Sequence, residues 1–212
     1  MTPEWPAGLR DYVEDYLAED ETLSTARARG RELGCMPIGT AGGAALQFLA
    51  TALQAKAVVE IGTGAGLSGL YLLRGMAADG VLTSIDAEPH HQAAARQAFA
   101  GAGVAPGRTR LIMGNALDVL PRLTDSGYDL IFVDATKTEY PAYYEHGVRL
   151  LRPGGVVAFD NVLWRGRVAD PDDQEPHTKA LREVTQLVKD DDRLVPVLLP
   201  IGDGLLVAAK AH

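Results

Sequence analysis

The stretch Val58-Val59-Glu60-Ile61-Gly62-Thr63-Gly64-Ala65-Gly66 decides the fold class of this chain. Its first half is a short apolar run rich in β-branched residues, which favours a buried strand. Its second half is a glycine-rich turn, and the residues from Leu67 to Met76 that follow are predicted to form a helix. Glycines at such a turn let the backbone approach a ligand closely, and the start of the helix offers free N–H groups.

The alternation of strand and helix continues beyond this stretch. Further strands are predicted at residues 81–85, 109–113, 128–133 and 156–159, and helices at 89–100, 116–123 and 140–151. Strands that alternate with helices require crossover connections, which produce a parallel sheet covered on both faces. One more helix is predicted around residues 181–188.

The C-terminal end follows a different pattern. Residues 194–199 and 205–209 both resemble strands, and only five residues, 200–204, join them. So short a connection forces an antiparallel pair. We therefore predict an α/β fold with a Rossmann-like sheet of seven strands, mostly parallel, closed by an antiparallel C-terminal hairpin and covered by helices on both faces.

The residues before the glycine-rich stretch are predicted to be helical, at 9–17, 24–33 and 42–54, because their apolar residues recur at helical spacing. A length of 212 residues suits one α/β domain. We expect a single domain over residues 1–212, with residues 1–35 as an N-terminal helical extension.

The composition narrows the range of partners. The net charge is −8 and no basic run occurs, so nucleic acid is not expected as a partner. No apolar run approaches the roughly 18 residues that a membrane span needs, so no membrane association is expected. The single cysteine, Cys35, cannot form an internal disulfide and is interpreted as a small buried residue, which suits a cytoplasmic protein.

The glycine-rich turn distinguishes between nucleotide cofactors. A dinucleotide fingerprint reads G-x-G-x-x-G, and here Gly66 falls one position early while Leu67 occupies the third place. Together with Glu60 at the end of the strand, this favours S-adenosylmethionine over NAD; a purely structural turn is the alternative. Asp86 ends the second strand, where a carboxylate accepts hydrogen bonds from ribose hydroxyls or caps the following helix, and the two roles are compatible.

Three polar residues end two later strands. Asp134 follows the strand at 128–133, and Asp160 and Asn161 follow the strand at 156–159. Consecutive strands are often neighbours in a sheet, so these oxygen ligands are expected to lie close together. Hard oxygen ligands favour Mg²⁺, with Ca²⁺ or Mn²⁺ as alternatives. The opposing interpretation is that Asp and Asn simply favour turns after strands.

The chain resembles a known family in a series of motifs that occur in the family's order. They cover about residues 36–210 and read VVEIGTGAGLSG, LTSIDAE, GNALDVLPRL, YDLIFVDATKTEY and LLRPGGVVAFDNVLWRG. These motifs are similar to those of the small cation-dependent O-methyltransferases, which include catechol O-methyltransferase and caffeoyl-CoA O-methyltransferase. The chain departs from the family pattern at Thr136, where relatives often have Asp.

The resemblance implies a role for each matching residue. Lys137 and Asp134 would be catalytic, and Asp134, Asp160 and Asn161 would bind the metal. The cofactor S-adenosylmethionine would be bound by Ile38, Glu60, Gly62, Thr63, Ser68, Asp86, Ala87, Asn115, Ala116 and Asp134. The resemblance also implies a homodimer.

The function expected from these motifs is metal-assisted methylation of a small vicinal diol such as a catechol. A bound dication would lower the pKa of the acceptor hydroxyl, and Lys137 would either accept its proton or steer the oxyanion. Trp164 would form a pocket wall or pack in the protein, and His90 and His91 are predicted to be exposed. The alternatives are an NAD-dependent oxidoreductase, an adenosylmethionine-binding protein without activity, and a methyltransferase that acts on another acceptor such as RNA.

Overall fold

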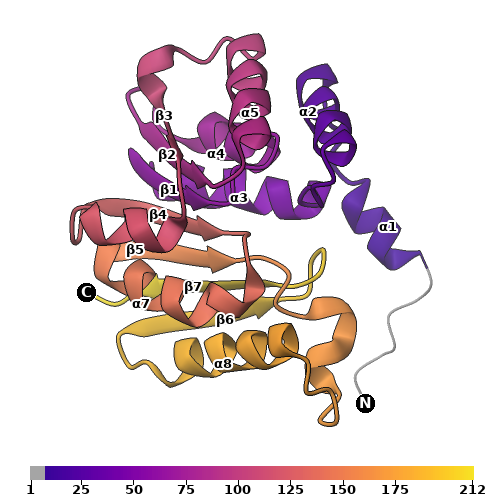
Figure 1. The fold of residues 1–212 in the computed structure, drawn as a ribbon, viewed down its shortest axis with the longest axis vertical. Coiled ribbons are helices and arrows are strands. Elements are labelled where there is room, and N and C mark those ends of the chain that lie inside the picture. Colours follow the sequence, from indigo (N-terminus) through magenta and orange to yellow (C-terminus); the bar gives the residue numbers. More distant parts are fainter. Residues whose placement is uncertain (1–7) are drawn as a thin grey trace.

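Seven strands form one mixed sheet in the computed structural model, which describes residues 8–212 (Figure 1). The strand order is β3-β2-β1-β4-β5-β7-β6. The strands are β1 (Ala57–Ile61), β2 (Val81–Asp86), β3 (Thr109–Met113), β4 (Tyr128–Val133), β5 (Leu151–Phe159), β6 (Leu194–Leu199) and β7 (Leu205–Lys210). The predicted fold class is confirmed.

The C-terminal hairpin does more than extend the sheet by two strands. β7 pairs antiparallel with both β5 and β6, so it lies between them.

β5 begins five residues before the predicted start at Val156. Leu151 pairs with Tyr128, and a register shift then leads to the pair Leu130–Val156. Pro153, Gly154 and Gly155 conceal this early part of the strand, since they are typical of a turn.

Helices cover both faces of the sheet. The helices α2 (Glu21–Glu32), α3 (Thr40–Ala52), α4 (Leu67–Gly75) and α5 (Pro89–Gly101) share one apolar core with the sheet. The helices α6 (Ala116–Val119), α7 (Tyr140–Leu150) and α8 (Pro176–Asp190) share the other. The strands supply alternate residues to each: Leu130 and Phe132 of β4 face the first core, and Ile131 and Val133 face the second.

Two helices are shorter than predicted by more than one residue. The helix expected at residues 116–123 ends as α6 at Val119 and continues as a 3₁₀ turn over Leu120–Arg122, where Pro121 lacks an N–H donor. The helix expected at 9–17 is α1 (Leu9–Glu14), which contains no buried residue. Residues 1–7 of the predicted N-terminal extension lie outside the described residues.

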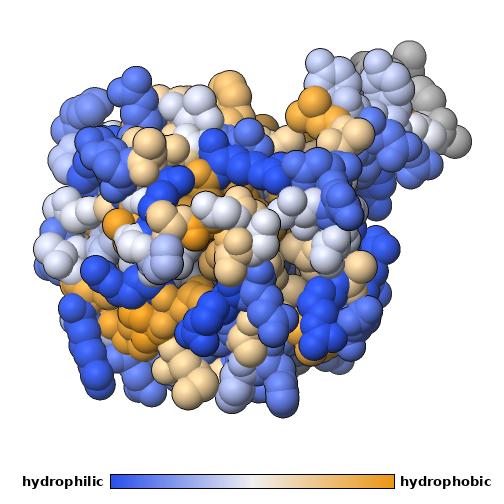
Figure 2. Space-filling view, turned by 90° about the horizontal axis from the view of Figure 1, so that it is seen from above, coloured by the Kyte–Doolittle hydropathy of each residue, from blue (hydrophilic) through white to orange (hydrophobic). Residues whose placement is uncertain are grey.

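Helix α1 lies at the periphery of the molecule. Figure 1 shows it beside the carboxyl ends of the central strands, away from the rest of the sheet. The face seen in Figure 2 is mostly hydrophilic, with smaller apolar patches between the polar groups. Within residues 8–212, no helix combines the length and the apolar character that crossing a bilayer requires.

Candidate functional site

A cavity of about 580 Å³ opens at the carboxyl ends of β1, β2 and β4. Its volume is in the range typical of small-molecule and cofactor sites. In an open α/β sheet, this edge is where ligands bind. The cavity is lined by the glycine-rich turn, the end of β2, the segment between α2 and α3, and the turns that follow β3, β4 and β5.

The glycine-rich turn has a backbone that only glycine adopts easily. Gly62, Gly64 and Gly66 have φ values of 96°, 49° and 87°. A Cβ atom on Gly62 would lie 1.9 Å from the carbonyl oxygen of Asp134, so the turn and the end of β4 are in direct backbone contact. This close approach brings the cofactor-type turn and the predicted metal ligand Asp134 to one side of the cavity.

Glu60 lies behind the cavity wall and does not line it. Its side chain is fully buried and accepts hydrogen bonds from Ser68 Oγ, at 2.6 Å, and from Ser84 Oγ, at 2.5 Å. Burial raises the pKa of Glu60 to about 7. Ser68 does line the cavity, so Glu60 reaches the site through the Ser68 hydroxyl.

Asp86 holds the glycine-rich turn in place. Its Oδ2 accepts hydrogen bonds from the backbone N–H groups of Thr63 and Gly64, both at 3.0 Å, and its Oδ1 accepts one from Glu88 N at 2.9 Å. The last of these bonds closes a turn before α5, but the N-cap of α5 is Glu88 and no side chain caps the helix, so the helix-capping interpretation of Asp86 is wrong. The carboxylate also lines the cavity, where a ribose hydroxyl could reach it.

The prediction that His91 is exposed is wrong. Its Nδ1 lies 3.2 Å from Asp86 Oδ2, its Nε2 lies 3.3 Å from Cys35 Sγ, and its side chain is 22% exposed. The sequence showed two adjacent histidines but not which of them turns inward; His90 is exposed. Cys35, interpreted as a buried residue, is half-buried and lines the cavity.

The remaining predicted cofactor residues also line the cavity. Ile38 is 5% exposed, and Arg27 holds its carbonyl oxygen at 2.7 Å while pairing with Glu19. Ala87, Asn115 and Ala116 lie around the same cavity. Asn115 Oδ1 also accepts a hydrogen bond from Leu117 N at 2.8 Å and caps α6.

Lys137 occupies the centre of the predicted metal cluster. Its Nζ donates hydrogen bonds to Asp134 Oδ1 at 2.8 Å, to Asn161 Oδ1 at 2.7 Å and to the Tyr140 hydroxyl at 2.7 Å. The three N–H donors of an ammonium group match these three oxygens. Burial raises the pKa of Tyr140 well above its ordinary value, and its hydroxyl donates in turn to the Asp160 carbonyl at 2.9 Å.

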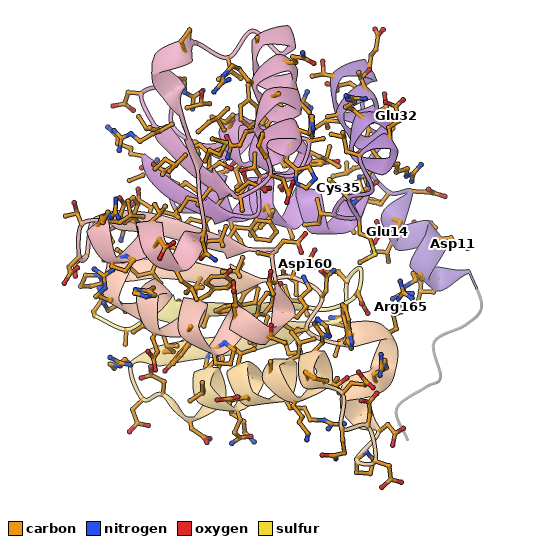
Figure 3. All side chains as sticks on the ribbon, viewed as in Figure 1. Asp11, Glu14, Glu32, Cys35, Asp160 and Arg165 are labelled. Carbon is orange, nitrogen blue, oxygen red and sulfur yellow. The ribbon has the colours of Figure 1, made fainter. Side chains whose placement is uncertain are left out.

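Asp160 lies beneath this cluster. Its residue is 5% exposed, and its Oδ1 accepts a hydrogen bond from Asn161 N at 2.8 Å. Burial is the main cause that raises the pKa of Asp160 to about 7, and the negative charge of Asp134 is the second. Asn161 itself has a φ of 60°, which turns its amide oxygen back towards Lys137. Figure 3 shows Asp160 at the carboxyl edge of the sheet.

The donor set fits a hard divalent cation. Asp134 and Asn161 already direct oxygens at one cationic group, and the repulsion between Asp134 and Asp160 is the kind that a dication relieves. The set contains only two carboxylates, and no cluster of three or more His, Cys, Asp or Glu side chains in residues 8–212 is arranged to hold a metal. A cation here would therefore depend on the amide oxygen and on ligands from outside the chain.

Residues that the sequence did not indicate complete the opposite end of the cavity. Met36, Glu139, Tyr143 and His177 line it together with Trp164. The Trp164 and His177 rings stack with centroids 5.8 Å apart, and the buried Trp164 Nε1 has no hydrogen-bond partner. Trp164 therefore forms part of the wall. Glu139 accepts a hydrogen bond from the Tyr143 hydroxyl, so this end carries a carboxylate.

The fold and the cavity together define a class of protein. A sheet of this strand order, with a glycine-rich turn after β1 and an acidic residue at the end of β2, has the methyltransferase fold. The O-methyltransferase family matches residues 12–211. The chain therefore belongs to the S-adenosylmethionine-dependent O-methyltransferases.

Individual relatives agree with this assignment. A protein of Mycolicibacterium vanbaalenii, described as a candidate O-methyltransferase, is 50% identical over 94% of this chain and 88% of its own length. The O-methyltransferase TomG of Streptomyces achromogenes, involved in tomaymycin synthesis and solved with S-adenosylmethionine, is 32% identical with a TM-score of 0.87, over 97% of this chain and 96% of its own. An O-methyltransferase of Bacillus cereus, solved with S-adenosylhomocysteine, is 29% identical with a TM-score of 0.87, over 96% and 97% of the two chains.

Proposed function

We propose that this enzyme transfers the methyl group of S-adenosylmethionine to one hydroxyl of a small catechol-like acceptor, with the help of a divalent cation. One observation carries the proposal: side-chain oxygens of Asp134 and Asn161 both point at the cationic Nζ of Lys137, at the edge of the cavity. Adjacent hydroxyls of a vicinal diol are suited to complete the coordination of a cation held in this way. A single phenol supplies only one oxygen and should be a poorer acceptor.

The cofactor would occupy the part of the cavity formed by the glycine-rich turn and the end of β2. Asp86 is positioned to accept hydrogen bonds from ribose hydroxyls, with Ala87 beside it and Asn115 and Ala116 near the base. Gly62, Thr63 and Ser68 would border the methionine portion, with Ile38 closing over it and Glu60 acting through Ser68.

Asp134, Asp160 and Asn161 would hold the cation, for which Mg²⁺ is the first candidate and Ca²⁺ or Mn²⁺ are alternatives. When bound, the cation would lower the pKa of the acceptor hydroxyl and stabilise its oxyanion. Tyr140 supports the cluster from below, because its hydroxyl bridges Lys137 Nζ and the Asp160 carbonyl.

Lys137 would steer the acceptor oxyanion as an ammonium group. Its three contacts are all with oxygen atoms, which matches the three N–H donors of an ammonium group. Its side chain is 8% exposed, so its charge is weakly screened by water. An ammonium group at this position would favour the ionised form of a nearby hydroxyl.

The charges around the cavity bear on the class of acceptor. Among the described residues that line it, Lys137 is the one lysine or arginine, and Glu139 is a carboxylate that the proposed cofactor and cation sites do not use. A polyanionic acceptor such as a coenzyme A thioester would find no further basic side chain here and would be repelled by Glu139. We therefore infer that the acceptor is a neutral or cationic catechol.

The experiment that tests this function measures transfer of labelled methyl groups to catechols and to matched single phenols, with Mg²⁺ or with EDTA. Asp160→Asn tests the cluster, and Asp172→Asn, at an exposed position, is the matched control. Catechol methylation that disappears with EDTA and in Asp160→Asn, but persists in Asp172→Asn, supports the proposal. Methylation that continues unchanged in EDTA contradicts the role of the metal.

We also propose that the enzyme is a homodimer. Tyr12, Tyr16, Leu17 and Phe48 are between 53% and 74% exposed and line one apolar pocket between α1 and α3. Exposed apolar groups that gather in this way are typical of protein–protein contacts. Light scattering after gel filtration should give twice the 22.6 kDa mass of the chain, and Phe48→Glu should reduce that mass.

A further inference from the structure

Three side chains form a continuous series of contacts beside the cavity: Asp86 and His91 are five residues apart, and Cys35 is distant in the sequence. Cys35 follows α2, Asp86 ends β2, and His91 lies in the first turn of α5. Cys35 Sγ is 3.3 Å from His91 Nε2, and His91 Nδ1 is 3.3 Å and 3.2 Å from the two carboxylate oxygens of Asp86. Figure 3 shows Cys35 near the lower ends of α2 and α5.

The chemistry of the three groups assigns the protons. An ionised carboxylate only accepts hydrogen bonds, so Nδ1 of His91 carries the proton that faces Asp86. The other ring nitrogen, Nε2, faces the thiol of Cys35, and the tautomer of the ring decides which of the two is the donor. Burial is the main cause that raises the pKa of the Cys35 thiol, and the charge of Asp86 is the second. The raised pKa favours the protonated thiol beside His91 Nε2.

The series connects two parts of the cofactor site. At one end, His91 bridges both oxygens of Asp86, whose Oδ2 also accepts the N–H groups of Thr63 and Gly64. This bridging contact restricts rotation of the carboxylate. At the other end, Cys35 begins the segment that continues through Met36, Pro37 and Ile38 along the cavity.

We propose that His91 is a positioning residue for the ribose of the cofactor: it orients the Asp86 carboxylate, and Cys35 orients the His91 ring. The inference rests on the proposed place of the cofactor ribose at Asp86. His91 acts on the cofactor through Asp86, and its effect belongs to cofactor binding and not to the transfer step. The motif that ends β2 does not include His91; the turn from β2 into α5 brings His91 to Asp86, and a tertiary contact brings Cys35 to His91.

The test is the affinity for S-adenosylhomocysteine, measured by titration calorimetry without acceptor or metal. In His91→Asn the side-chain amide nitrogen lies near the position of the His91 Nδ1 atom, so it can still donate to Asp86. In His91→Gln the amide nitrogen lies nearer the position of Nε2, so that donor is lost. His91→Ala and His91→Gln should therefore weaken binding about tenfold, the loss of one hydrogen bond to a charged group, and His91→Asn should stay within about threefold of wild type. His90→Ala, at the adjacent exposed position, is the matched control and should bind as wild type.

Steady-state kinetics of His91→Ala and of one further variant, Cys35→Ala, complete the test. His91→Ala should raise the KM for S-adenosylmethionine about tenfold and change kcat less than about twofold, and Cys35→Ala should raise the KM about threefold, as loss of a weak neutral hydrogen bond implies. Wild-type affinity in His91→Ala and His91→Gln overturns the inference, as does equal weakening in His91→Asn and His91→Gln. If His91→Ala fails to fold, the comparison of Asn with Gln decides.

The Asp86→Asn variant separates this inference from the proposed function. If Asp86→Asn binds weakly while His91→Ala binds as wild type, Asp86 recognises the cofactor without help from His91, and only the inference fails. If Asp86→Asn binds as wild type, the assignment of Asp86 to the ribose fails, and the inference fails with it.

Discussion

Replacing Glu60 by Gln should change how the stability of the cofactor-free protein depends on pH. Glu60 is fully buried, and burial raises its pKa from an ordinary 4.5 to about 7. The folded protein therefore holds this proton more tightly than the unfolded chain does. The contribution to stability is complete below about pH 4.5 and is lost as the pH rises through about 7.

The size of the effect follows from the two pKa values. A difference of about 2.5 pKa units, at about 1.36 kcal/mol per unit, corresponds to about 3 kcal/mol of unfolding free energy. Glutamine keeps the shape of the side chain and remains neutral at every pH. Its amide can still bond with Ser68 and Ser84, the two hydroxyls that contact Glu60. Between pH 5 and pH 8, Glu60→Gln should therefore gain up to about 3 kcal/mol relative to wild type.

Urea unfolding at a series of pH values from 5 to 8 measures this difference. Burial also raises the pKa of Asp160 to about 7, and its contribution to the pH dependence is present in both proteins, so the comparison isolates Glu60. Glu183→Gln, at an exposed position, is the matched control and should follow the wild type. Parallel pH profiles for Glu60→Gln and wild type would refute the reasoning, because they would mean that Glu60 does not change its protonation on folding.

Three further predictions concern the turn, the sheet and the catalytic cluster. Gly62→Ala should lower the unfolding free energy by about 3 kcal/mol in urea titrations, because its Cβ would lie 1.9 Å from the Asp134 carbonyl at a φ of 96°; an unchanged midpoint would contradict the close contact. Asp129→Asn should cost about 1–2 kcal/mol at pH 7. Burial raises the pKa of Asp129, but hydrogen bonds such as that from Ala57 N outweigh burial, so the pKa lies below its ordinary value of 3.8. The cost should therefore shrink as the pH falls below 3.8, and a cost that persists at low pH would argue against the charge. Lys137→Met should reduce kcat at least about a hundredfold while calorimetry shows S-adenosylhomocysteine affinity unchanged; comparable loss of both would place Lys137 in the cofactor site instead.

The order of elements could be predicted from the sequence because each signal is local. The strands at 109–113, 128–133 and 194–199 have the predicted bounds, since each is a compact apolar run between turn residues. The exceptions are segments whose ends depend on contacts with other parts of the fold. Pro153 and the two glycines after it are typical of turns, and only pairing with β4 draws this segment into β5. The helix expected to reach Leu17 ends at Glu14, where no packing extends it.

Part of the site could be predicted for the same reason. Asp86, Asp134 and Asp160 end strands, and parallel strands bring their carboxyl ends to one edge whatever the rest of the fold does. Glu60 shows where this reasoning reached its limit. Its place in the motif indicated a cofactor ligand, but the side chain points into the protein and contacts the cavity through Ser68.

The sequence by itself determined the fold class, the glycine-rich turn and the acidic strand ends, because strand periodicity and turn chemistry are properties of neighbouring residues. Tertiary structure alone decided that β7 lies between β5 and β6, that Lys137 stands among Asp134, Tyr140 and Asn161, and that His91 meets Cys35 across 56 positions of sequence. The second group of contacts depends on which face of each helix turns inward. Packing of the two apolar cores against the sheet sets that orientation, and no local pattern records it.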